Sequence, residues 1–216
     1  MQQENAGPGH GLALFVRRWA SNPYRIGGIL PSARPLARVM ASAGVQARRG
    51  EGPVVELGAG TGTITRALIE NGVGERELVL VERDRQMCRW LRQRFPRATV
   101  VRDEAARLGM ILARECAGTA SVVISSLPLR NMGMREREAI VEASLDAVPE
   151  GGALVQYTYA RHPAVACARL GLECRRVGFV AMNVPPAGVW RITRSGAASR
   201  STAAASSRPD PGGPNG

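Results

Sequence analysis

Pro53-Val54-Val55-Glu56-Leu57-Gly58-Ala59-Gly60-Thr61-Gly62 is the stretch that decides the fold. Its first half reads as a short buried strand, its glycines predict a tight turn, and residues 63–71 have the pattern of a helix. Glycines let the backbone approach a ligand, and the free N–H groups at the start of a helix face it. Glu82 follows the next predicted strand, where a carboxylate accepts hydrogen bonds from ribose hydroxyls. The stretch therefore predicts a nucleotide-like ligand at the ends of two strands.

The glycine spacing narrows the kind of ligand. Residues 56–62 read acidic-x-Gly-x-Gly-x-Gly rather than the Gly-x-Gly-x-x-Gly of dinucleotide-binding folds. They resemble the first motif of the class I S-adenosylmethionine-dependent methyltransferases. The resemblance implies S-adenosyl-L-methionine as cofactor, a ligand that has a ribose but no pyrophosphate. The residues it assigns to cofactor binding in this part of the chain are Glu56, Gly58, Gly60, Thr61, Gly62 and Glu82.

Strand and helix patterns alternate along the chain, which predicts an α/β fold with helices on both faces of a mostly parallel sheet. The predicted strands are residues 54–57, 78–82, 99–102, 120–125, 153–159, 175–182 and 188–193. The predicted helices are residues 63–71, 85–95, 105–116, 135–148 and 163–170. Only a short turn separates the last two strands, so they are expected to form an antiparallel hairpin at one edge. This is the seven-stranded, Rossmann-like sheet of class I methyltransferases.

Two further groups of ligand residues follow from where ligands bind in this fold, beyond the carboxyl ends of the strands. Asp103 and Glu104 come after the third strand, where they are expected to hold the adenine. The alternative for Asp103 is a helix N-cap, and both roles can coexist. Ser125 ends the fourth strand and is expected at the cofactor, and residues 125–129 lie where this fold usually holds the methyl acceptor.

Tyrosines are rare in the chain, and their positions predict catalytic residues. Tyr24 follows an Asn-Pro pair, while Tyr157 and Tyr159 are two apart on the fifth strand and so share a face. Methyl transfer to an amine places positive charge on the nitrogen, and aromatic rings stabilise such a cation. The alternative is that the strand tyrosines are ordinary β-sheet residues.

Composition and charge restrict the partners of this 216-residue chain. It has 29 basic residues, all arginine, against 18 acidic ones, a formal net charge of +11. Residues 1–50 contain seven of the arginines and one acidic residue, which suggests attraction to lipid or nucleic-acid phosphates. The four cysteines form no Cys-x-x-Cys pair and are expected to be reduced thiols, with no metal site.

The chain is expected to divide into four parts. Residues 1–10 and 195–216 are predicted to be disordered, residues 11–50 to form a helical membrane or lid segment, and residues 51–194 to form the methyltransferase domain. Within residues 11–20, Leu12, Phe15, Val16 and Trp19 lie on one helical face, and Arg17 and Arg18 lie on the other. This pattern is typical of an interfacial membrane helix, and a lid that packs on the domain is the alternative.

Residues 25–40 resemble the N-terminal signature of the bacterial phospholipid N-methyltransferases, which typically reads Gly-Ala-Ile-x-Pro-Ser-Ser followed by Leu-Ala. Residues 56–62, 126–129, 156–159 and 183–190 agree with that family, whereas Ala33 and Arg102 depart from it. The resemblance implies stepwise N-methylation of phosphatidylethanolamine, and a monomer is expected. The first apolar run is too short for a signal-peptide core, and no stretch approaches the length of a membrane span. The protein is therefore expected to be cytoplasmic and peripherally bound to the anionic inner face of the cell membrane.

Two other functions remain as alternatives. An rRNA adenine N6-dimethyltransferase shares the glycine motif, but that family carries Asn-Leu-Pro-Tyr where this chain has Ser126-Leu127-Pro128-Leu129. The groups that hold a flipped base are thus missing, and no nucleic-acid partner is expected. Cofactor binding without catalysis is the third possibility.

Overall fold

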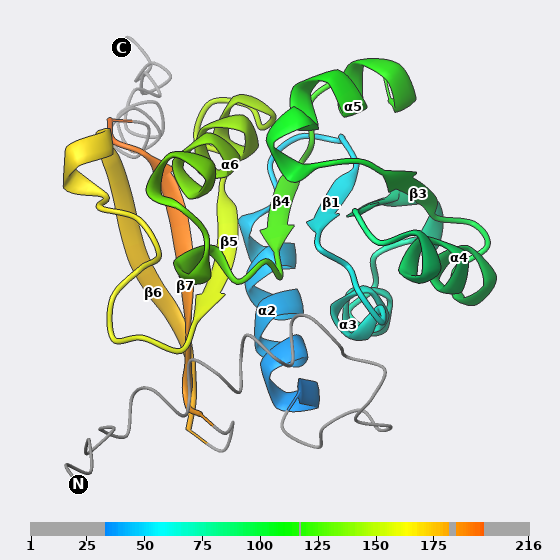
Figure 1. Ribbon diagram of the computed structural model, residues 1–216, viewed down its shortest axis with the longest axis horizontal. Helices are drawn as coiled ribbons and strands as arrows, with labels where there is room; N and C mark the ends of the chain where they lie inside the picture. The colour runs from blue at the N-terminus through cyan, green and yellow to red at the C-terminus, as the bar shows by residue number, and fades with distance from the viewer. Residues whose placement is uncertain (1–32, 117, 182–184, 197–216) are drawn as a thin grey trace, which may run out of the picture.

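One seven-stranded sheet is the centre of the protein (Figure 1). The computed structural model describes residues 33–116, 118–181 and 185–196. In these residues the strands are β1 Val54–Leu57, β2 Leu78–Glu82, β3 Thr99–Arg102, β4 Val122–Ser125, β5 Leu154–Thr158, β6 Leu172–Val180 and β7 Ala187–Arg194. Their order across the sheet is β3-β2-β1-β4-β5-β7-β6. Strands β1 to β5 are parallel, and β7 pairs antiparallel with both β5 and β6. The predicted edge hairpin is confirmed.

Helices cover both faces of the sheet (Figure 1). They are α2 Ala33–Ala47, α3 Thr63–Glu70, α4 Arg85–Arg94, α5 Leu108–Glu115 and α6 Met134–Asp146. Four single 3-10 turns join them to the strands: η1 Glu75–Glu77, η2 Ala105–Arg107, η3 Leu129–Asn131 and η4 Ala168–Leu170. Residues of α2, α3 and α4 share one core with one face of the sheet, and residues of α5 and α6 share a second core with the other. None of the helices in the described part is long and apolar enough to cross a membrane.

The central parallel strands β1, β2 and β4 are mostly apolar because both of their faces are buried. In β1, Val54 packs in the core of α2 and α3, while Val55 and Leu57 pack in the core of α5 and α6. All three side chains are fully buried. Glu56 interrupts this run and is buried with it, so it needs a partner inside the protein.

Helix α2 packs directly against the sheet, although the sequence places it in a segment ahead of the domain. Leu36, Met40 and Ala41 are buried in the same core as β1 and β4. Gly44 allows this close packing, because a Cβ at that position would overlap the side chain of Ile124 in β4. The amino-terminal end of α2 lies toward the edge where the parallel strands end (Figure 1).

The predicted helix over residues 163–170 is wrong. Residues 163–167 form an irregular loop with a bend, and only the short 3-10 turn η4 at the end of the segment is helical. Gly171 then takes a left-handed conformation (φ 62°) that reverses the chain into β6. An apolar pattern of eight residues is too short to separate a helix from a packed loop, and here the tight reversal into β6 favours the loop.

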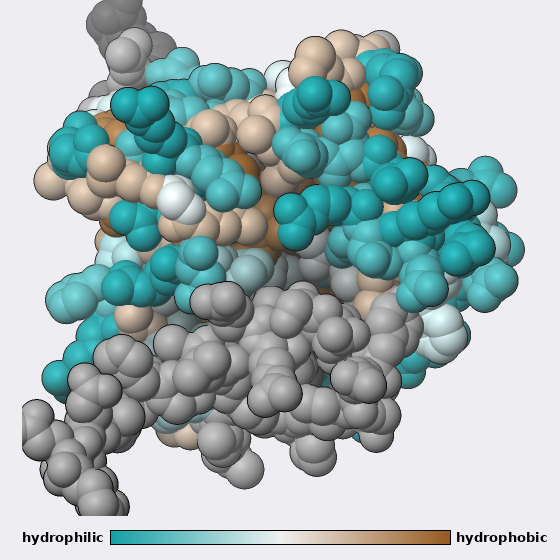
Figure 2. All heavy atoms as spheres, viewed as in Figure 1, coloured by the Kyte–Doolittle hydropathy of each residue, from teal (hydrophilic) through white to brown (hydrophobic). Residues whose placement is uncertain are grey.

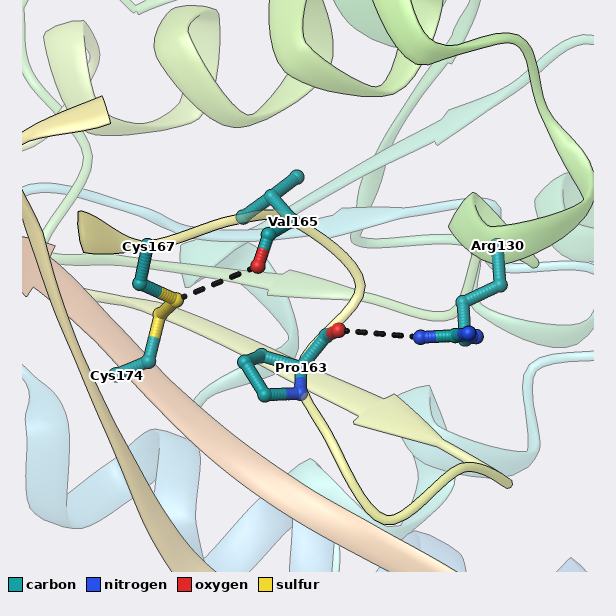
Figure 3. The surroundings of a disulfide bond; sticks show 5 residues. All are labelled: Arg130, Pro163, Val165, Cys167 and Cys174. Atoms are coloured by element: carbon teal, nitrogen blue, oxygen red, sulfur yellow. Dashed lines mark hydrogen bonds between the residues drawn. A yellow bond between two sulfur atoms is a disulfide. The ribbon is translucent and has the colours of Figure 1, made fainter. Parts of the chain in front are cut away.

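The expectation of four reduced cysteines is also wrong for one pair. Cys167 and Cys174 form a disulfide with a Cα–Cα distance of 6.1 Å, and Cys88 and Cys116 are free. The disulfide links the η4 loop to β6, and Cys167 Sγ lies 3.6 Å from the carbonyl of Val165 (Figure 3). The reversal at Gly171 brings the two cysteines together, and this was not visible in their spacing.

Candidate active site

The glycine turn after β1 joins three neighbouring elements. Gly58 N donates to Val81 O of β2 at 2.8 Å, and Gly62 N donates to Ala59 O at 2.8 Å. Gly58, Gly60 and Gly62 all have positive φ, of 73°, 54° and 75°. A Cβ on Gly58 would overlap Leu127, and one on Gly62 would overlap Phe95, so both glycines permit close packing. At Gly60 the nearest atom to such a Cβ is Gly58 O at 3.7 Å, which leaves this residue accessible to a ligand.

Glu82 lies at the end of β2 and is hydrogen-bonded to the glycine turn. Its Oε2 accepts a hydrogen bond from Gly60 N at 3.0 Å, and its Oε1 accepts one from Asp84 N at 2.9 Å. Each oxygen retains a second lone pair, and the residue is only partly buried. The carboxylate is therefore fixed beside Gly60 and can still accept from hydroxyl groups of a ligand.

Glu56 differs from Glu82 because it is almost completely buried. Its Oε2 accepts a hydrogen bond from the hydroxyl of Thr65 in α3 at 2.6 Å, while its Oε1 is buried with no partner among the described residues. Burial raises the pKa of Glu56 to about 8, and the nearby charge of Glu82 adds to this, whereas the hydrogen bond from Thr65 opposes it. The hydroxyl of Ser126 also lowers this pKa, so Ser126 and Glu56 are neighbours beside the glycine turn.

Asp103 and Glu104 lie just past β3, next to the end of β2. The register pairs Glu82 with Arg102, so Asp103 is one residue beyond the neighbouring strand end. Asp103 Oδ1 accepts from Glu104 N at 2.8 Å and lies 3.8 Å from a guanidinium nitrogen of Arg107. Glu104 is the N-cap residue of η2, so Asp103 does not take the N-cap position. Its contact with adenine stays a prediction.

The loop after β4 is held by buried polar groups. Ser125 is fully buried, and its hydroxyl accepts from Leu127 N at 3.3 Å, so it shapes the turn of this loop. Its predicted role at the cofactor has no further support in these contacts. The sequence analysis did not select Gln156, which pairs with Ser125 in the sheet. Its Nε2 donates to Leu127 O at 3.0 Å and to Tyr157 O at 2.8 Å.

Buried polar atoms gather around this loop. Gln156 Oε1 is buried without a hydrogen-bond partner in the part of the chain that the structure describes, whereas the buried Ser126 Oγ lies close enough to Glu56 to lower its pKa. Such groups cost free energy unless something pairs with them. Gln156 lies in the middle of the buried strand β5, and only its register beside Ser125 marks it as a site candidate.

Two of the three predicted catalytic tyrosines are neighbours. The rings of Tyr157 and Tyr159 meet edge to face, with centroids 5.4 Å apart. Burial raises the pKa of Tyr157 well above its usual range, and Tyr159 adds to this, so the Tyr157 phenol stays protonated. It is therefore unsuited to accept a proton. Tyr24 and the predicted helix of residues 11–20 lie outside the described residues.

Trp90 is a second residue that the sequence analysis did not select. It lies on α4 and is about half exposed, at 47%, and its Nε1 donates to Thr61 O at 3.3 Å. The indole thus ties α4 to the glycine turn. In the described residues no three metal-ligating side chains gather.

The fold matches solved methyltransferases. The glycopeptide N-methyltransferase MtfA, solved with S-adenosyl-L-methionine, superimposes with a TM-score of 0.56 at 14% identity, over 73% of this chain and 93% of that one. The chain therefore has the fold of the class I S-adenosylmethionine-dependent methyltransferases, as its glycine motif predicts.

Two curated relatives are similar in sequence. An ornithine lipid N-methyltransferase of Singulisphaera acidiphila is 28% identical over 140 residues, which are 63% of this chain and 73% of the relative. Ribosomal RNA small subunit methyltransferase A of a Synechococcus species is 46% identical over 65 residues, which are 28% of this chain and 22% of the relative. No family model matches the chain.

Proposed function

We propose that the chain transfers methyl groups from S-adenosyl-L-methionine to the amine of a membrane lipid, with phosphatidylethanolamine as the substrate. The loop after β4 carries this proposal, because the unpaired acceptor Gln156 Oε1 lies beside it and the hydroxyl of Ser126 lies on it. Tyr157 is on the same strand as Gln156, and Tyr159, whose ring meets that of Tyr157, lies one residue past the end of that strand. Acceptors suit an amine that donates, and aromatic faces suit the cation that methylation produces. The likeness to a lipid N-methyltransferase supports a lipid as the acceptor.

The residues around the glycine turn fit the proposed cofactor. Gly60 gives the open approach, Glu82 has acceptor capacity for ribose hydroxyls, and Asp103 lies at the next strand end. S-adenosyl-L-methionine supplies an electrophilic methyl group on a sulfonium. The chain's own contribution is to orient the amine toward that methyl group and to exclude water, a positioning effect.

The amine must lose a proton before it reacts. Tyr157 is excluded as the acceptor by its raised pKa, whose main cause is burial. Tyr24, Tyr159, a water molecule and the lipid phosphate remain candidates. Of these candidates, Tyr159 is the one whose position the structure describes. It is partly buried, and its ring lies beside that of Tyr157 in β5.

Membrane association is part of the proposal. Residues 11–20 are proposed to bind the anionic inner face of the cell membrane from the cytoplasm, and the enzyme is proposed to act there as a monomer. The excess of arginine over acidic residues in the first 50 residues supports this.

An rRNA adenine N6-dimethyltransferase is the second candidate, favoured by the local likeness to an rRNA methyltransferase. Ser126 and Leu129 stand where that family has asparagine and an aromatic residue, so the base-holding groups are absent. Incubation of the purified protein with radiolabelled S-adenosyl-L-methionine, mixed-lipid vesicles and rRNA separates the two. We expect label in phosphatidylethanolamine derivatives, and label in RNA alone would contradict the lipid function.

Replacing Tyr159 by phenylalanine is expected to lower kcat by roughly a hundredfold, the size of effect typical of a lost proton-transfer group, with cofactor affinity unchanged. The ring still shields a cation, but the hydroxyl that orients the amine is gone. Tyr159→Leu removes both and is expected to be slower still. A Tyr159→Phe enzyme with wild-type turnover on phosphatidylethanolamine would limit the role of Tyr159 to its ring.

A further inference from the structure

A cleft of about 150 Å³ lies between α2 and α3, where both helices begin, and the glycine turn closes one end of it. Its polar lining consists of Arg34 and Arg38 from α2, Arg66 and Glu70 from α3, and Thr61 and Thr63 from the turn and the first residue of α3. The cleft thus adjoins the predicted cofactor site through Thr61 but is lined mainly by residues that the proposed methyl transfer does not use.

The three arginines of the cleft have no acidic partner among the described residues. Arg34, Arg38 and Arg66 are exposed, and none of their guanidinium groups makes a hydrogen bond or ion pair within that part of the chain. Arg34 and Arg38 are four residues apart and so lie on the same side of α2. Glu70 is the one acidic residue in the lining, so the charged side chains of the cleft sum to an excess of positive charge. Grouped cations of this kind raise the local concentration of anions.

Further features of the cleft suit an anion with several oxygens. The N–H groups at the start of α3 add partial positive charge next to Thr63, the first residue of that helix. The hydroxyls of Thr61 and Thr63 are hydrogen-bonded to each other at 3.1 Å, which leaves one of the two O–H groups free to donate to an anion. Guanidinium groups bind phosphate oxygens in pairs, which gives geometric selectivity as well as charge.

Trp90 indicates where this anion comes from. The indole is bonded to the carbonyl of Thr61, a residue of the cleft lining, and almost half of its surface is exposed. Tryptophan is enriched at the boundary between lipid headgroups and hydrocarbon, where its apolar ring and its N–H are both satisfied. An exposed tryptophan beside an arginine cleft is therefore typical of contact with lipid headgroups rather than with a soluble anion.

We propose that the cleft between α2 and α3 binds the phosphodiester of a membrane phospholipid through Arg34, Arg38 and Arg66. The proposal rests on the proposed function, since that function brings the protein to a phospholipid surface. The phosphate belongs either to the methyl acceptor itself or to a neighbouring lipid. In both cases the cleft sets the orientation of the protein on the membrane, with the glycine turn facing the lipid.

The test is a set of charge-removing variants measured by vesicle flotation. The triple change Arg34→Gln, Arg38→Gln and Arg66→Gln is expected to weaken binding to phosphatidylglycerol-containing vesicles roughly a hundredfold, at about fivefold for each arginine at an anionic surface. The matched control changes Arg135, Arg161 and Arg175 to glutamine, three exposed arginines that make no hydrogen bond or ion pair within the described ranges. This control is expected to stay within about threefold of wild type, because charges away from the surface are screened.

Two further readouts identify the bound phosphate. Methylation of phosphatidylethanolamine in uncharged detergent micelles gives a raised KM for the triple variant if the substrate's own phosphate is bound. If a neighbouring lipid supplies the phosphate, KM changes only in vesicles that contain phosphatidylglycerol. Thermal unfolding confirms that the variant is folded, and the single change Arg66→Gln serves if the triple variant is not.

Three results overturn the proposal. The first is equal vesicle binding by the triple variant and its control. The second is a loss of S-adenosyl-L-methionine affinity with vesicle binding intact, which would assign the cleft to the cofactor carboxylate. The third is an arginine dependence found with rRNA and not with vesicles. If the wild-type protein methylates no lipid but the triple variant alone loses vesicle binding, the proposed function fails and the phosphate site stands.

Discussion

Replacement of Gly60 by arginine is expected to abolish S-adenosyl-L-methionine binding in a protein that still folds. Gly60 is the one glycine of the turn whose Cβ would meet only the carbonyl of Gly58, at 3.7 Å, so a side chain there projects into open space. That space is where the backbone of the turn would face the cofactor. Alanine at Gly60 tests the same point with the smallest possible group, and we expect it to weaken binding by at least about tenfold. Calorimetry with S-adenosyl-L-methionine measures both.

Any side chain introduced at a glycine with positive φ strains the backbone. Several glycines of this chain have a positive φ, so one that is distant from the site can serve as a control. Gly60 has a φ of 54° and Gly72 one of 88°, and a Cβ on Gly72 meets nothing within 4 Å. Both alanine variants are expected to lose about 1 kcal/mol of stability or slightly more from the left-handed backbone. Only the change at Gly60 is expected to affect cofactor affinity.

Gly62→Ala is expected to act mainly on the stability of the protein, whereas the change at Gly60 acts mainly on cofactor affinity. A Cβ at Gly62 would overlap the ring of Phe95 and approach Leu91, so the loss is expected in the folded state itself. A folded Gly60→Arg protein with unchanged cofactor affinity would refute the role assigned to the glycine turn. A Gly62→Ala protein of wild-type stability would contradict the packing.

The sequence was sufficient for the parallel half of the sheet. The bounds of β1, β2 and β3 agree with prediction residue for residue, because strands buried on both faces are continuous apolar runs that end at polar or glycine residues. The positions of Glu56 and Glu82 followed for the same reason, since a carboxylate inside or at the end of such a run is conspicuous. The edge hairpin was predictable from the short turn before β7.

Tertiary contacts decided what the sequence missed. The loop of residues 163–170 and the Cys167–Cys174 disulfide both depend on the chain reversing at Gly171, and no local pattern encodes the partner strand. Gln156 became a site candidate only when the register set it beside Ser125. Arg34 of α2 and Arg66 of α3 line the same cleft. They are far apart in the sequence, so the sequence alone did not predict that they are neighbours. Tyr24 and residues 11–20 lie outside the described residues and stay predictions.

The stability of the protein is expected to fall as the pH rises from about 4.5 to about 8, because of Glu56. Its carboxyl is buried, and burial raises its pKa from 4.5 to about 8. Between these values the folded state holds a proton that the unfolded state has lost. The unfolding free energy therefore decreases with pH, by at most about 1.4 kcal/mol per pH unit and about 5 kcal/mol in total. The contribution is complete below the unfolded pKa and is lost above the folded pKa.

Glu56→Gln removes this titration while preserving an oxygen that can accept from the Thr65 hydroxyl. We expect the variant to resemble wild type at about pH 5 and to be more stable by several kcal/mol at about pH 9, where wild type must bury a carboxylate. Urea unfolding at both pH values measures the difference.

Glu77→Gln is the control of opposite sign, because hydrogen bonds from Arg48 and from the backbone of Gly74 lower the pKa of Glu77. A lowered folded pKa contributes stability above the unfolded value, and that stability is lost as the pH falls through the folded pKa. The stability of the Glu77 variant is therefore expected to be lower than that of wild type at neutral pH and to converge with it in acid.

If the stability of Glu56→Gln ran parallel to that of wild type from pH 5 to pH 9, the Glu56 carboxyl would already be ionised at neutral pH. That result would contradict the raised pKa of Glu56.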